Sequence, residues 1–301
     1  MNNLKDRIIA LKKSRNALIL AHFYQDIEIQ EIADIVGDSF ELATKAKETD
    51  ADIIVLCGVR FMAESAKILN PDKKVLLPVL SAGCPMADMI TADDVKRLRA
   101  AHPDAAVVCY INSSAAVKAE SDICCTSSSA ERIVRSLPQK RILFIPDQNL
   151  GAYVASKIPE KEIILYDGYC PIHHRVRVED VKKVKSFYPT MPILMHPECR
   201  PEILALADMV GSTSQIIDYA LHDVGKEFII GTEMGVVSRL RLLAPDKHFY
   251  LLSQGLFCPN MKKTALADVL NALEQDRYQI ALTPSEIAGA EISLLKMIAV
   301  K

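Results

Sequence analysis

The sequence predicts an α/β fold of three homologous αβα domains, with parallel sheets in a pseudo-threefold arrangement around a central cavity. The first observation is a repeat, because Cys84, Cys170 and Cys258 are each followed by proline and lie 86 and 88 positions apart. The second is that a helical pattern with an acidic first turn follows each pair. The third is that apolar runs alternate with helical patterns, which is typical of βαβ units.

The elements of each unit can be assigned in chain order. Residues 1–13 carry Leu and Ile at helical spacing among Lys, Asp and Arg, which predicts an amphipathic helix and not a signal peptide. Strands are predicted at 17–21, 53–56, 105–109, 141–145, 163–166, 192–195, 228–230 and 249–252. A short helical pattern should end at Ser39, Ser127 and Thr213, and helices at 91–99, 177–185 and 265–273 should each close one unit and open the next.

The repeats divide the chain into three predicted domains. The first comprises residues 1–84 together with 259–301, the second 85–170 and the third 171–258. Each unit has about 86 residues, which is small for an independent hydrophobic core. We therefore expect the three units to bury apolar surface against one another.

Polar residues recur at equivalent positions after the strands. The repeat aligns His22, Tyr110 and His196 with one another, then Tyr24, Asn112 and Glu198, and then Ser39, Ser127 and Thr213. Functional groups of parallel α/β sheets collect beyond the carboxyl ends of the strands. If the domains meet edge to edge, these side chains and the three Cys-Pro cysteines converge on one cavity.

The three Cys-Pro cysteines indicate a metal centre. Proline favours the first helical turn, so each thiol should lie near a helix N-terminus, where the partial positive charge favours the thiolate. Three neighbouring thiolates need a cation, either zinc with His173 or His174 as a fourth ligand, or an iron–sulfur cluster. A [4Fe-4S] cluster with three protein ligands leaves one iron open as a Lewis acid. A zinc hydrolase and a non-enzymatic iron–sulfur carrier or sensor remain alternatives, and the colour of the protein separates zinc from iron–sulfur.

The other recurring residues have two interpretations each. A Ser or Thr before a helix is commonly an N-cap, whereas three hydroxyls at helix N-termini around a cavity would bind carboxylates or phosphate. His22 and His196 are either structural histidines or site residues. Glu198, facing Tyr24 across the pseudo-axis, would supply a carboxylate and a phenol for proton transfer.

Composition excludes several classes of protein. The formal net charge is −2, so no bulk charge attracts nucleic acid. No apolar run approaches the ~20 residues of a membrane span, and we expect a cytoplasmic protein. The eight cysteines then indicate thiols, metal binding or catalysis and not a disulfide framework.

Segments spread along nearly the whole chain carry a family resemblance. They are Ala21-His-Phe-Tyr-Gln, Gly37-Asp-Ser, Cys57-Gly-Val-Arg-Phe-Met-Ala-Glu, Gly83-Cys-Pro-Met, Tyr110-Ile-Asn-Ser-Ser, Cys125-Thr-Ser, Pro146-Asp-Gln-Asn-Leu-Gly, His196-Pro-Glu-Cys, Gly211-Ser-Thr and Gly231-Thr-Glu. With these motifs the chain resembles quinolinate synthase, the A protein of bacterial NAD biosynthesis. The resemblance implies three αβα domains around one [4Fe-4S] cluster whose ligands are Cys84, Cys170 and Cys258.

The resemblance also implies a reaction and residue roles. Iminoaspartate would condense with dihydroxyacetone phosphate to give quinolinate, phosphate and two waters, and the enzyme that supplies unstable iminoaspartate is a possible transient partner. Glu198 would be the principal general base and Tyr24 its acid partner, while His22 and His196 bind and polarise substrate. The substrate-binding residues would be Ser39, Tyr110, Asn112, Ser127 and Thr213. The chain lacks the C-terminal C-x-x-C pair of some members, so we expect no redox control through such a pair.

Overall fold

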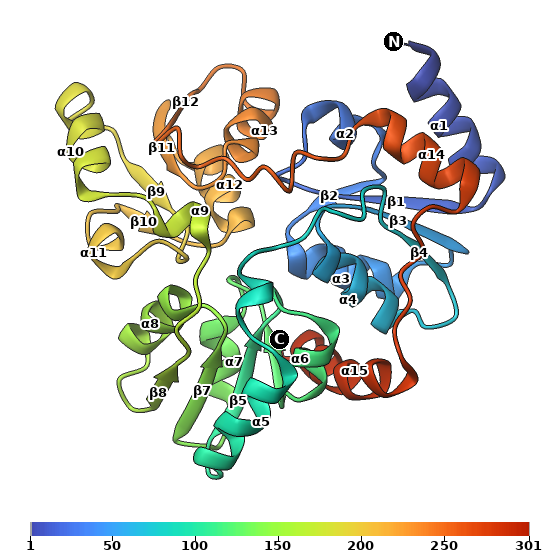
Figure 1. The fold of residues 1–301 in the computed structure, drawn as a ribbon. Coiled ribbons are helices and arrows are strands. Elements are labelled where there is room, and N and C mark those ends of the chain that lie inside the picture. Colours follow the sequence, from blue (N-terminus) through green and yellow to red (C-terminus); the bar gives the residue numbers. More distant parts are fainter. Residues whose placement is uncertain (1, 301) are drawn as a thin grey trace.

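The computed structural model describes residues 2–300 and contains three parallel four-stranded sheets with the same strand order. The first sheet has the order β2-β1-β3-β4, with β1 (Ala17–His22), β2 (Ile35–Gly37), β3 (Ile53–Cys57) and β4 (Lys74–Leu76). The second has the order β6-β5-β7-β8, with β5 (Ala106–Tyr110), β6 (Ile123–Cys125), β7 (Arg141–Ile145) and β8 (Glu162–Leu165). The third has the order β10-β9-β11-β12, with β9 (Ile193–Met195), β10 (Met209–Val210), β11 (Glu227–Gly231) and β12 (His248–Leu251). The predicted α/β class is confirmed, and Figure 1 shows the three sheets around a common centre, while the pseudo-threefold arrangement stays a prediction.

Helices connect the strands of every sheet. The first unit contains α1 (Asn2–Ser14), α2 (Ile27–Ile32), α3 (Ser39–Glu48) and α4 (Arg60–Leu69). The 3-10 helix η1 (Ala87–Met89) leads to the second unit, with α5 (Ala92–Ala101), α6 (Ala115–Ala119), α7 (Ala130–Ser136) and α8 (Gln148–Lys157). The third unit contains α9 (Pro171–His174), α10 (Val178–Phe187), α11 (Pro201–Leu204), α12 (Thr213–His222) and α13 (Gly235–Leu243). The chain ends with α14 (Leu266–Gln275) and α15 (Pro284–Ala299).

One prediction is wrong because the sequence analysis missed the short edge strands β2, β6 and β10. A single helical pattern was expected to end at Ser39, Ser127 and Thr213, but a short helix is followed by β2, β6 or β10 before each of these residues. Ser39 and Thr213 are the first residues of α3 and α12. Edge strands of two or three residues are too short to show the alternation that identifies a strand.

An aspartate that recurs in all three units holds β2, β6 and β10 beside β1, β5 and β9. The carboxylates of Asp34, Asp122 and Asp208 accept hydrogen bonds from the backbone amides of Ile19, Val107 and Ile193 at 2.8, 2.7 and 2.8 Å. The backbone amide of each aspartate donates to the carbonyl of the same strand residue. This two-way contact adds to the few ladder bonds of β2, β6 and β10 and fixes the register in which each edge strand begins to pair.

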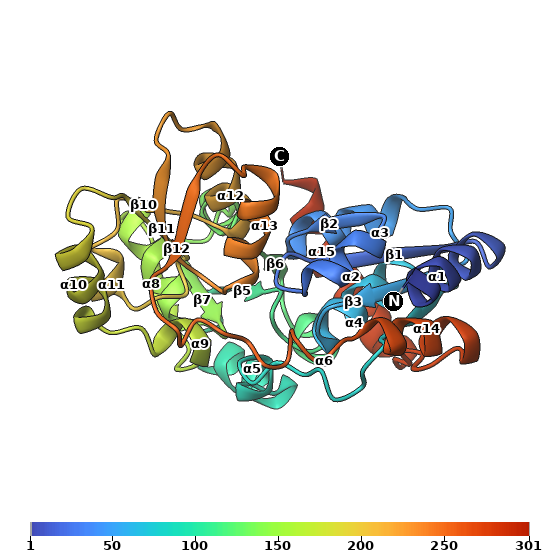
Figure 2. The same ribbon diagram turned by 90° about the horizontal axis from the view of Figure 1, so that it is seen from above.

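The C-terminal segment packs against two units. Figures 1 and 2 both show α14 beside α1, and its Val269 and Leu273 lie in the core under the first sheet. By contrast α15 packs on α6 and β6 of the second unit and also contacts α4 of the first. Its Leu294 and Met297 belong to one apolar cluster that runs through both units. The C-terminal segment thus contacts the first unit through both helices and the second unit through α15, and the predicted domain boundaries, with 259–301 in the first domain, stay a prediction.

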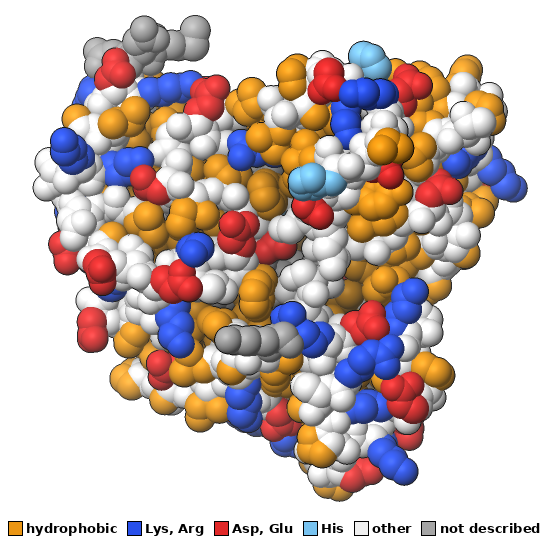
Figure 3. Space-filling view, turned by 180° about the vertical axis from the view of Figure 1, so that it is seen from behind, with side chains coloured by type: hydrophobic (Ala, Val, Ile, Leu, Met, Phe, Trp, Pro, Cys, Tyr) orange, Lys and Arg blue, Asp and Glu red, His pale blue; other side chains and the backbone are white. Residues whose placement is uncertain are grey.

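The surface carries charges of both signs. On the face shown in Figure 3, Lys and Arg are interspersed with Asp and Glu and do not form one basic field. This agrees with the formal net charge of −2. None of the helices described within residues 2–300 combines the length and the apolar character needed to cross a bilayer.

Candidate active site

A cavity of about 440 Å³ lies beyond the carboxyl ends of strands from all three sheets. Every residue that the sequence predicts for the site lines it: His22, Tyr24, Ser39, Cys84, Tyr110, Asn112, Ser127, Cys170, His196, Glu198, Thr213 and Cys258. The volume is in the range of small-molecule sites. The structure therefore brings residues of all three units to one place, as the repeat positions predict.

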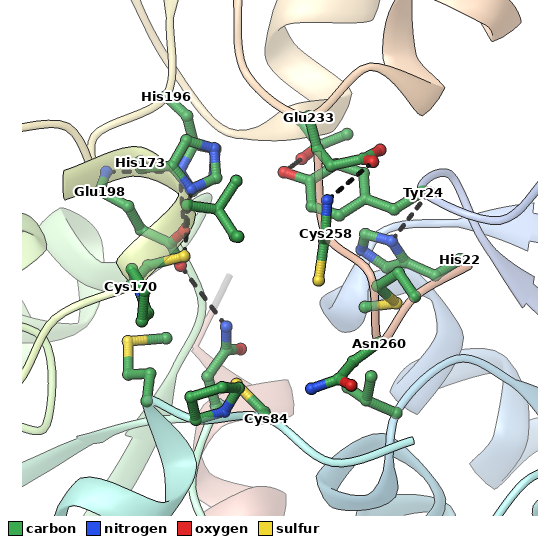
Figure 4. A pocket seen from close by; sticks show the side chains of 18 of the residues that line it. His22, Tyr24, Cys84, Cys170, His173, His196, Glu198, Glu233, Cys258 and Asn260 are labelled. Carbon is green, nitrogen blue, oxygen red and sulfur yellow. Dashed lines mark hydrogen bonds and ion pairs between the residues drawn. The ribbon is translucent and has the colours of Figure 1, made fainter. Parts of the chain in front are cut away.

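The three Cys-Pro thiols face the cavity from different sides (Figure 4). They are partly exposed, whereas the other five cysteines are buried. Burial raises the pKa of the Cys84 thiol to about 12 and also raises the pKa values of Cys170 and Cys258, although backbone amides that donate to each sulfur act in the opposite direction. Only Cys170 is the N-cap of an α-helix, α9, whereas Cys84 precedes the 3-10 helix η1 and Cys258 precedes no helix before α14. The amides favour the thiolates as expected, but desolvation is the larger effect. These thiols need a cation to become thiolates.

Glu198 is buried and surrounded by hydrogen-bond donors. Its Oε1 accepts from Tyr110 Oη at 2.7 Å and from Asn112 Nδ2 at 3.5 Å, and its Oε2 is 2.7 Å from His173 Nδ1. Burial acts to raise the pKa of this carboxyl, but His196, His173 and the hydrogen bonds outweigh it, so the pKa of Glu198 is lowered. A carboxylate held in this way is a weak base by itself.

Tyr24 contacts two threonines and is not bonded to Glu198. Its Oη is 3.1 Å from Thr213 Oγ1 and 2.9 Å from Thr232 Oγ1, and Thr232 Oγ1 is 3.0 Å from His173 Nε2. Together with the contact between His173 and Glu198, this forms a continuous chain from Tyr24 to the carboxylate. Burial raises the pKa of Tyr24 well above its ordinary value, so the phenol holds its proton.

The sequence analysis missed two of the residues that link Tyr24 to Glu198. His173 was considered only as a zinc ligand, and Thr232 only as part of the Gly231-Thr-Glu motif. The position of His173 one turn after Cys170 was the available signal, since both lie at the start of α9. Nothing in the local sequence of Thr232 indicates its contact with Tyr24, because the two residues come from different sheets.

The two predicted histidines are buried and neutral. Burial lowers the pKa of His22 to about 3 and that of His196 to about 4. His22 Nδ1 accepts from the backbone amide of Tyr24 at 3.1 Å, and His196 Nδ1 accepts from that of Glu198 at 3.3 Å. An accepting Nδ1 in a neutral imidazole leaves the proton on Nε2. Both rings can therefore donate a hydrogen bond from Nε2, and His196 Nε2 lies 3.3 Å from Ser127 Oγ.

The capping interpretation is wrong for Ser39 and Thr213. The N-cap of α3 is Asp38, whose Oδ1 accepts from the amides of Phe40 and Glu41 at 3.0 Å. The N-cap of α12 is Ser212, so Thr213 Oγ1 is available to Tyr24. Asp38 also lines the cavity, and its carboxylate weakens the case for a second anion at the start of α3.

Glu233 and Lys262 add charge beside the cavity; the sequence analysis included Glu233 only in the Gly231-Thr-Glu motif and did not include Lys262. Glu233 is fully buried and accepts from the backbone amides of Gly235 at 2.7 Å and Cys258 at 3.3 Å. Lys262 Nζ is 3.6 Å from Glu233 Oε2 and donates to the backbone carbonyl of Tyr24. This lysine joins the loop after Cys258 to the turn that follows β1.

Comparison with known proteins gives a consistent result. The family described as quinolinate synthetase A protein matches residues 6–299. Quinolinate synthase of Caldicellulosiruptor saccharolyticus is 55% identical over 298 residues, which cover 99% of this chain and 98% of that protein. Quinolinate synthase of Alkaliphilus metalliredigens is 55% identical over 299 residues, covering 99% of each chain. Quinolinate synthase 2 of Methanosarcina acetivorans is 49% identical over 302 residues, covering 99% of this chain and 97% of that protein. The chain belongs to the quinolinate synthetase A protein family.

Proposed function

We propose that the chain is a quinolinate synthase that condenses iminoaspartate with dihydroxyacetone phosphate, giving quinolinate, phosphate and two waters. The observation that carries the proposal is the meeting of three thiols from three units with Glu198, Tyr24 and two neutral histidines in one cavity. A simple electron carrier would not need these proton-transfer groups beside its cluster. The names of the relatives support the same activity.

The three thiols fit a [4Fe-4S] cluster held by Cys84, Cys170 and Cys258. Each sulfur receives backbone amide donors, which are common around iron–sulfur clusters, and the three approach from separate segments. No other cysteine within residues 2–300 lines the cavity, so one iron would keep an open position. When bound, the cluster would supply a Lewis acid that polarises a substrate oxygen.

The hydrogen-bonded residues from Tyr24 to Glu198 can pass a proton along the wall of the cavity. Because Glu198 accepts from His173 Nδ1, the free lone pair of His173 is on Nε2 and accepts from Thr232. Thr232 Oγ1 in turn accepts from Tyr24 Oη. Glu198 then acts through His173 as the final acceptor, and Tyr24 is the group that meets the substrate. This arrangement retains the predicted pairing of Glu198 and Tyr24 but makes it indirect.

Other residues would bind and orient the substrates. His22 and His196 present Nε2–H groups that polarise carbonyl or hydroxyl oxygens without carrying a charge. Ser127 and Thr213 would hold carboxylate or phosphate oxygens, with the N-terminus of α12 adding partial positive charge. Tyr110 and Asn112 hold the Glu198 carboxylate in place and complete the substrate-binding set with Ser39.

We also propose that the protein works in the cytoplasm and meets one transient partner. The eight cysteines are all unpaired, which suits the reducing cytoplasm. Iminoaspartate is unstable, so a transient contact with the enzyme that supplies it belongs to the proposal. The substrates are small molecules, and neither nucleic acid nor a membrane is part of it.

The test uses anaerobic, iron- and sulfide-reconstituted protein. Supplied with freshly generated iminoaspartate and dihydroxyacetone phosphate, it should form quinolinate, identified by mass, and release phosphate in equal amount. The preparation should be brown with broad visible absorption, as iron–sulfur proteins are. A colourless zinc protein with full activity, or a brown protein that forms no quinolinate from these substrates, would exclude the proposal.

A further inference from the structure

Three donor atoms of different kinds lie together beside the start of α9. Cys170 Sγ, His173 Nδ1 and Glu198 Oε2 all lie within 4.8 Å of one another. His173 Nδ1 is 3.3 Å from the sulfur and 2.7 Å from the carboxylate oxygen, and Figure 4 shows the three side chains converging. A thiolate, an imidazole and a carboxylate are ligands that zinc takes in proteins. This set shares only Cys170 with the three-thiol site.

A tetrahedral ion would need only small movements of these atoms. Zinc bonds of about 2.0 to 2.3 Å place two ligand atoms about 3.3 to 3.6 Å apart. The sulfur and nitrogen already have this separation, at 3.3 Å. The nitrogen and oxygen, now 2.7 Å apart as a hydrogen-bonded pair, would separate by roughly half an ångström.

The groups that orient metal ligands are also present. The other ring nitrogen of His173 contacts Thr232 Oγ1 at 3.0 Å, and the other oxygen of Glu198 accepts from Tyr110 Oη at 2.7 Å. Partners of this kind fix the orientation of ligating imidazoles and carboxylates. They are in place without the metal, so the side chains are already oriented for binding.

The charges balance in a buried site. One thiolate and one carboxylate neutralise a divalent cation, which matters because His173 and Glu198 are 1% and 4% exposed. On binding, the Cys170 thiol loses one proton to solvent. The proton of His173 leaves Nδ1 and one is held at Nε2, where it donates to Thr232. Each ion bound therefore releases one proton from the protein.

We propose that the cluster-free chain binds one divalent zinc-like ion through Cys170, His173 and Glu198. A water molecule would take the fourth position. The ion excludes the cluster, because both need the Cys170 thiolate, and it occupies the two atoms through which His173 passes a proton to Glu198. Binding of the ion is independent of the proposed function, whereas the exclusion of the cluster rests on it.

Cobalt is a suitable probe because Co²⁺ replaces zinc and its visible bands report tetrahedral geometry. The full-length, cluster-free chain is titrated with Co²⁺ without oxygen and without added thiol. We expect one ion per chain, intense visible bands and a sulfur-to-cobalt charge-transfer band of one thiolate. Zinc added afterwards should displace the cobalt and remove the colour.

Matched variants identify the ligands. Cys170→Ser should remove the charge-transfer band. His173→Ala and Glu198→Gln should each weaken Co²⁺ binding by ~10- to 100-fold or more, because losing even a group that only hydrogen-bonds a metal ligand has an effect of that size. His174→Ala is the control for His173, since His174 is the adjacent histidine and lies outside the donor set. Cys84→Ser and Cys258→Ser should bind cobalt as the unaltered chain does, although neither should assemble a cluster.

The outcomes separate the two sites. If Cys84→Ser or Cys258→Ser loses cobalt, or if the spectrum has the intensity of several thiolates, the ion lies in the three-thiol site and the proposal is wrong. It is also wrong if no cobalt binds. In a second experiment, zinc-loaded protein should take up no iron and sulfide until a chelator removes the zinc. One zinc and a full cluster on the same chain would overturn the exclusion.

Discussion

The turn after β1 and the turn after β9 have the same backbone structure and opposite chemistry. In each, a histidine Nδ1 accepts from the amide two residues later, and the histidine carbonyl accepts from the amide three residues later. The residue two positions after the histidine is Tyr24 in one turn and Glu198 in the other. The repeat therefore reproduces the backbone, while one side chain gives the first turn a phenol and the second a carboxylate.

The two turns also differ in what connects them. Tyr24 reaches Glu198 only through Thr232 and His173, which both belong to the third unit. The first unit thus contributes the phenol, and the third contributes the carboxylate and everything between. Equivalent repeat positions can therefore be linked by hydrogen bonds without touching each other.

Preventing assembly of the proposed cluster should have the largest effect. Replacing Cys84, Cys170 or Cys258 with Ala should abolish cluster assembly, because each is proposed to supply one of three ligands. Iron and sulfide per chain after anaerobic reconstitution measure the effect. Cys109→Ser is the control, since Cys109 is buried in β5 and its sulfur contacts Ser113 Oγ at 2.9 Å. Full iron content in Cys170→Ala would show that the ligands are wrongly assigned.

The opposite chemistry of the two turns can be tested by changing either one. Glu198→Gln and Tyr24→Phe keep the shape of the side chain but interrupt the proton chain, so turnover should fall by ~100-fold or more while substrate still binds. Steady-state kinetics on protein of matched iron content measure this. The control is Glu202→Gln, an exposed glutamate in α11. Near-normal turnover in Glu198→Gln or Tyr24→Phe would show that proton transfer between these two residues is not part of the mechanism.

The two buried histidines should make the cluster-free protein sensitive to acid. Their folded pKa values, about 3 for His22 and about 4 for His196, lie below the ordinary 6.5, so the unfolded chain binds protons that the folded chain does not. Stability is then lost as pH falls below 6.5. From about pH 7.5 to about pH 5, each should lower the free energy of unfolding by about 2 kcal/mol.

Denaturant unfolding at both pH values measures this loss. His22→Asn and His196→Asn should each lose less stability on acidification than the unaltered chain, by the contribution of one histidine. Equal losses in all three proteins would mean that the two turns do not keep their imidazoles neutral.

The smallest expected effects distinguish Ser212, which caps α12, from the adjacent Thr213. Ser212→Ala removes the N-cap of α12 and should lower the free energy of unfolding by about 1 kcal/mol. Thr213→Ala should leave stability nearly unchanged and raise KM about 10-fold, because its hydroxyl is proposed to meet a charged substrate group. If Thr213→Ala lowers stability as much as Ser212→Ala and leaves KM unchanged, Thr213 is structural.

The repeat made much of the fold predictable. A spacing of 86 and 88 residues aligned three strands, three helix starts and three cysteines before any contact was known. The acidic first turns were equally informative, since Asp94, Asp180 and Asp268 all accept from the N-cap amide, at 2.8, 2.9 and 2.9 Å. Strands of two or three residues and the packing of α15 were not predictable in this way, because short segments carry no period and α15 has no counterpart in the repeat.

The sequence by itself determined the fold class and which residues share one cavity. Both follow from periodicity, because equivalent positions of similar units end at equivalent places in space. Only the tertiary structure decided how those residues are connected: that Glu198 bonds Tyr110 and His173, that Thr232 links His173 to Tyr24, and that burial raises the pKa values of the three thiols. Hydrogen bonds and desolvation depend on ångström-scale distances between units, and no pattern along one chain encodes those distances.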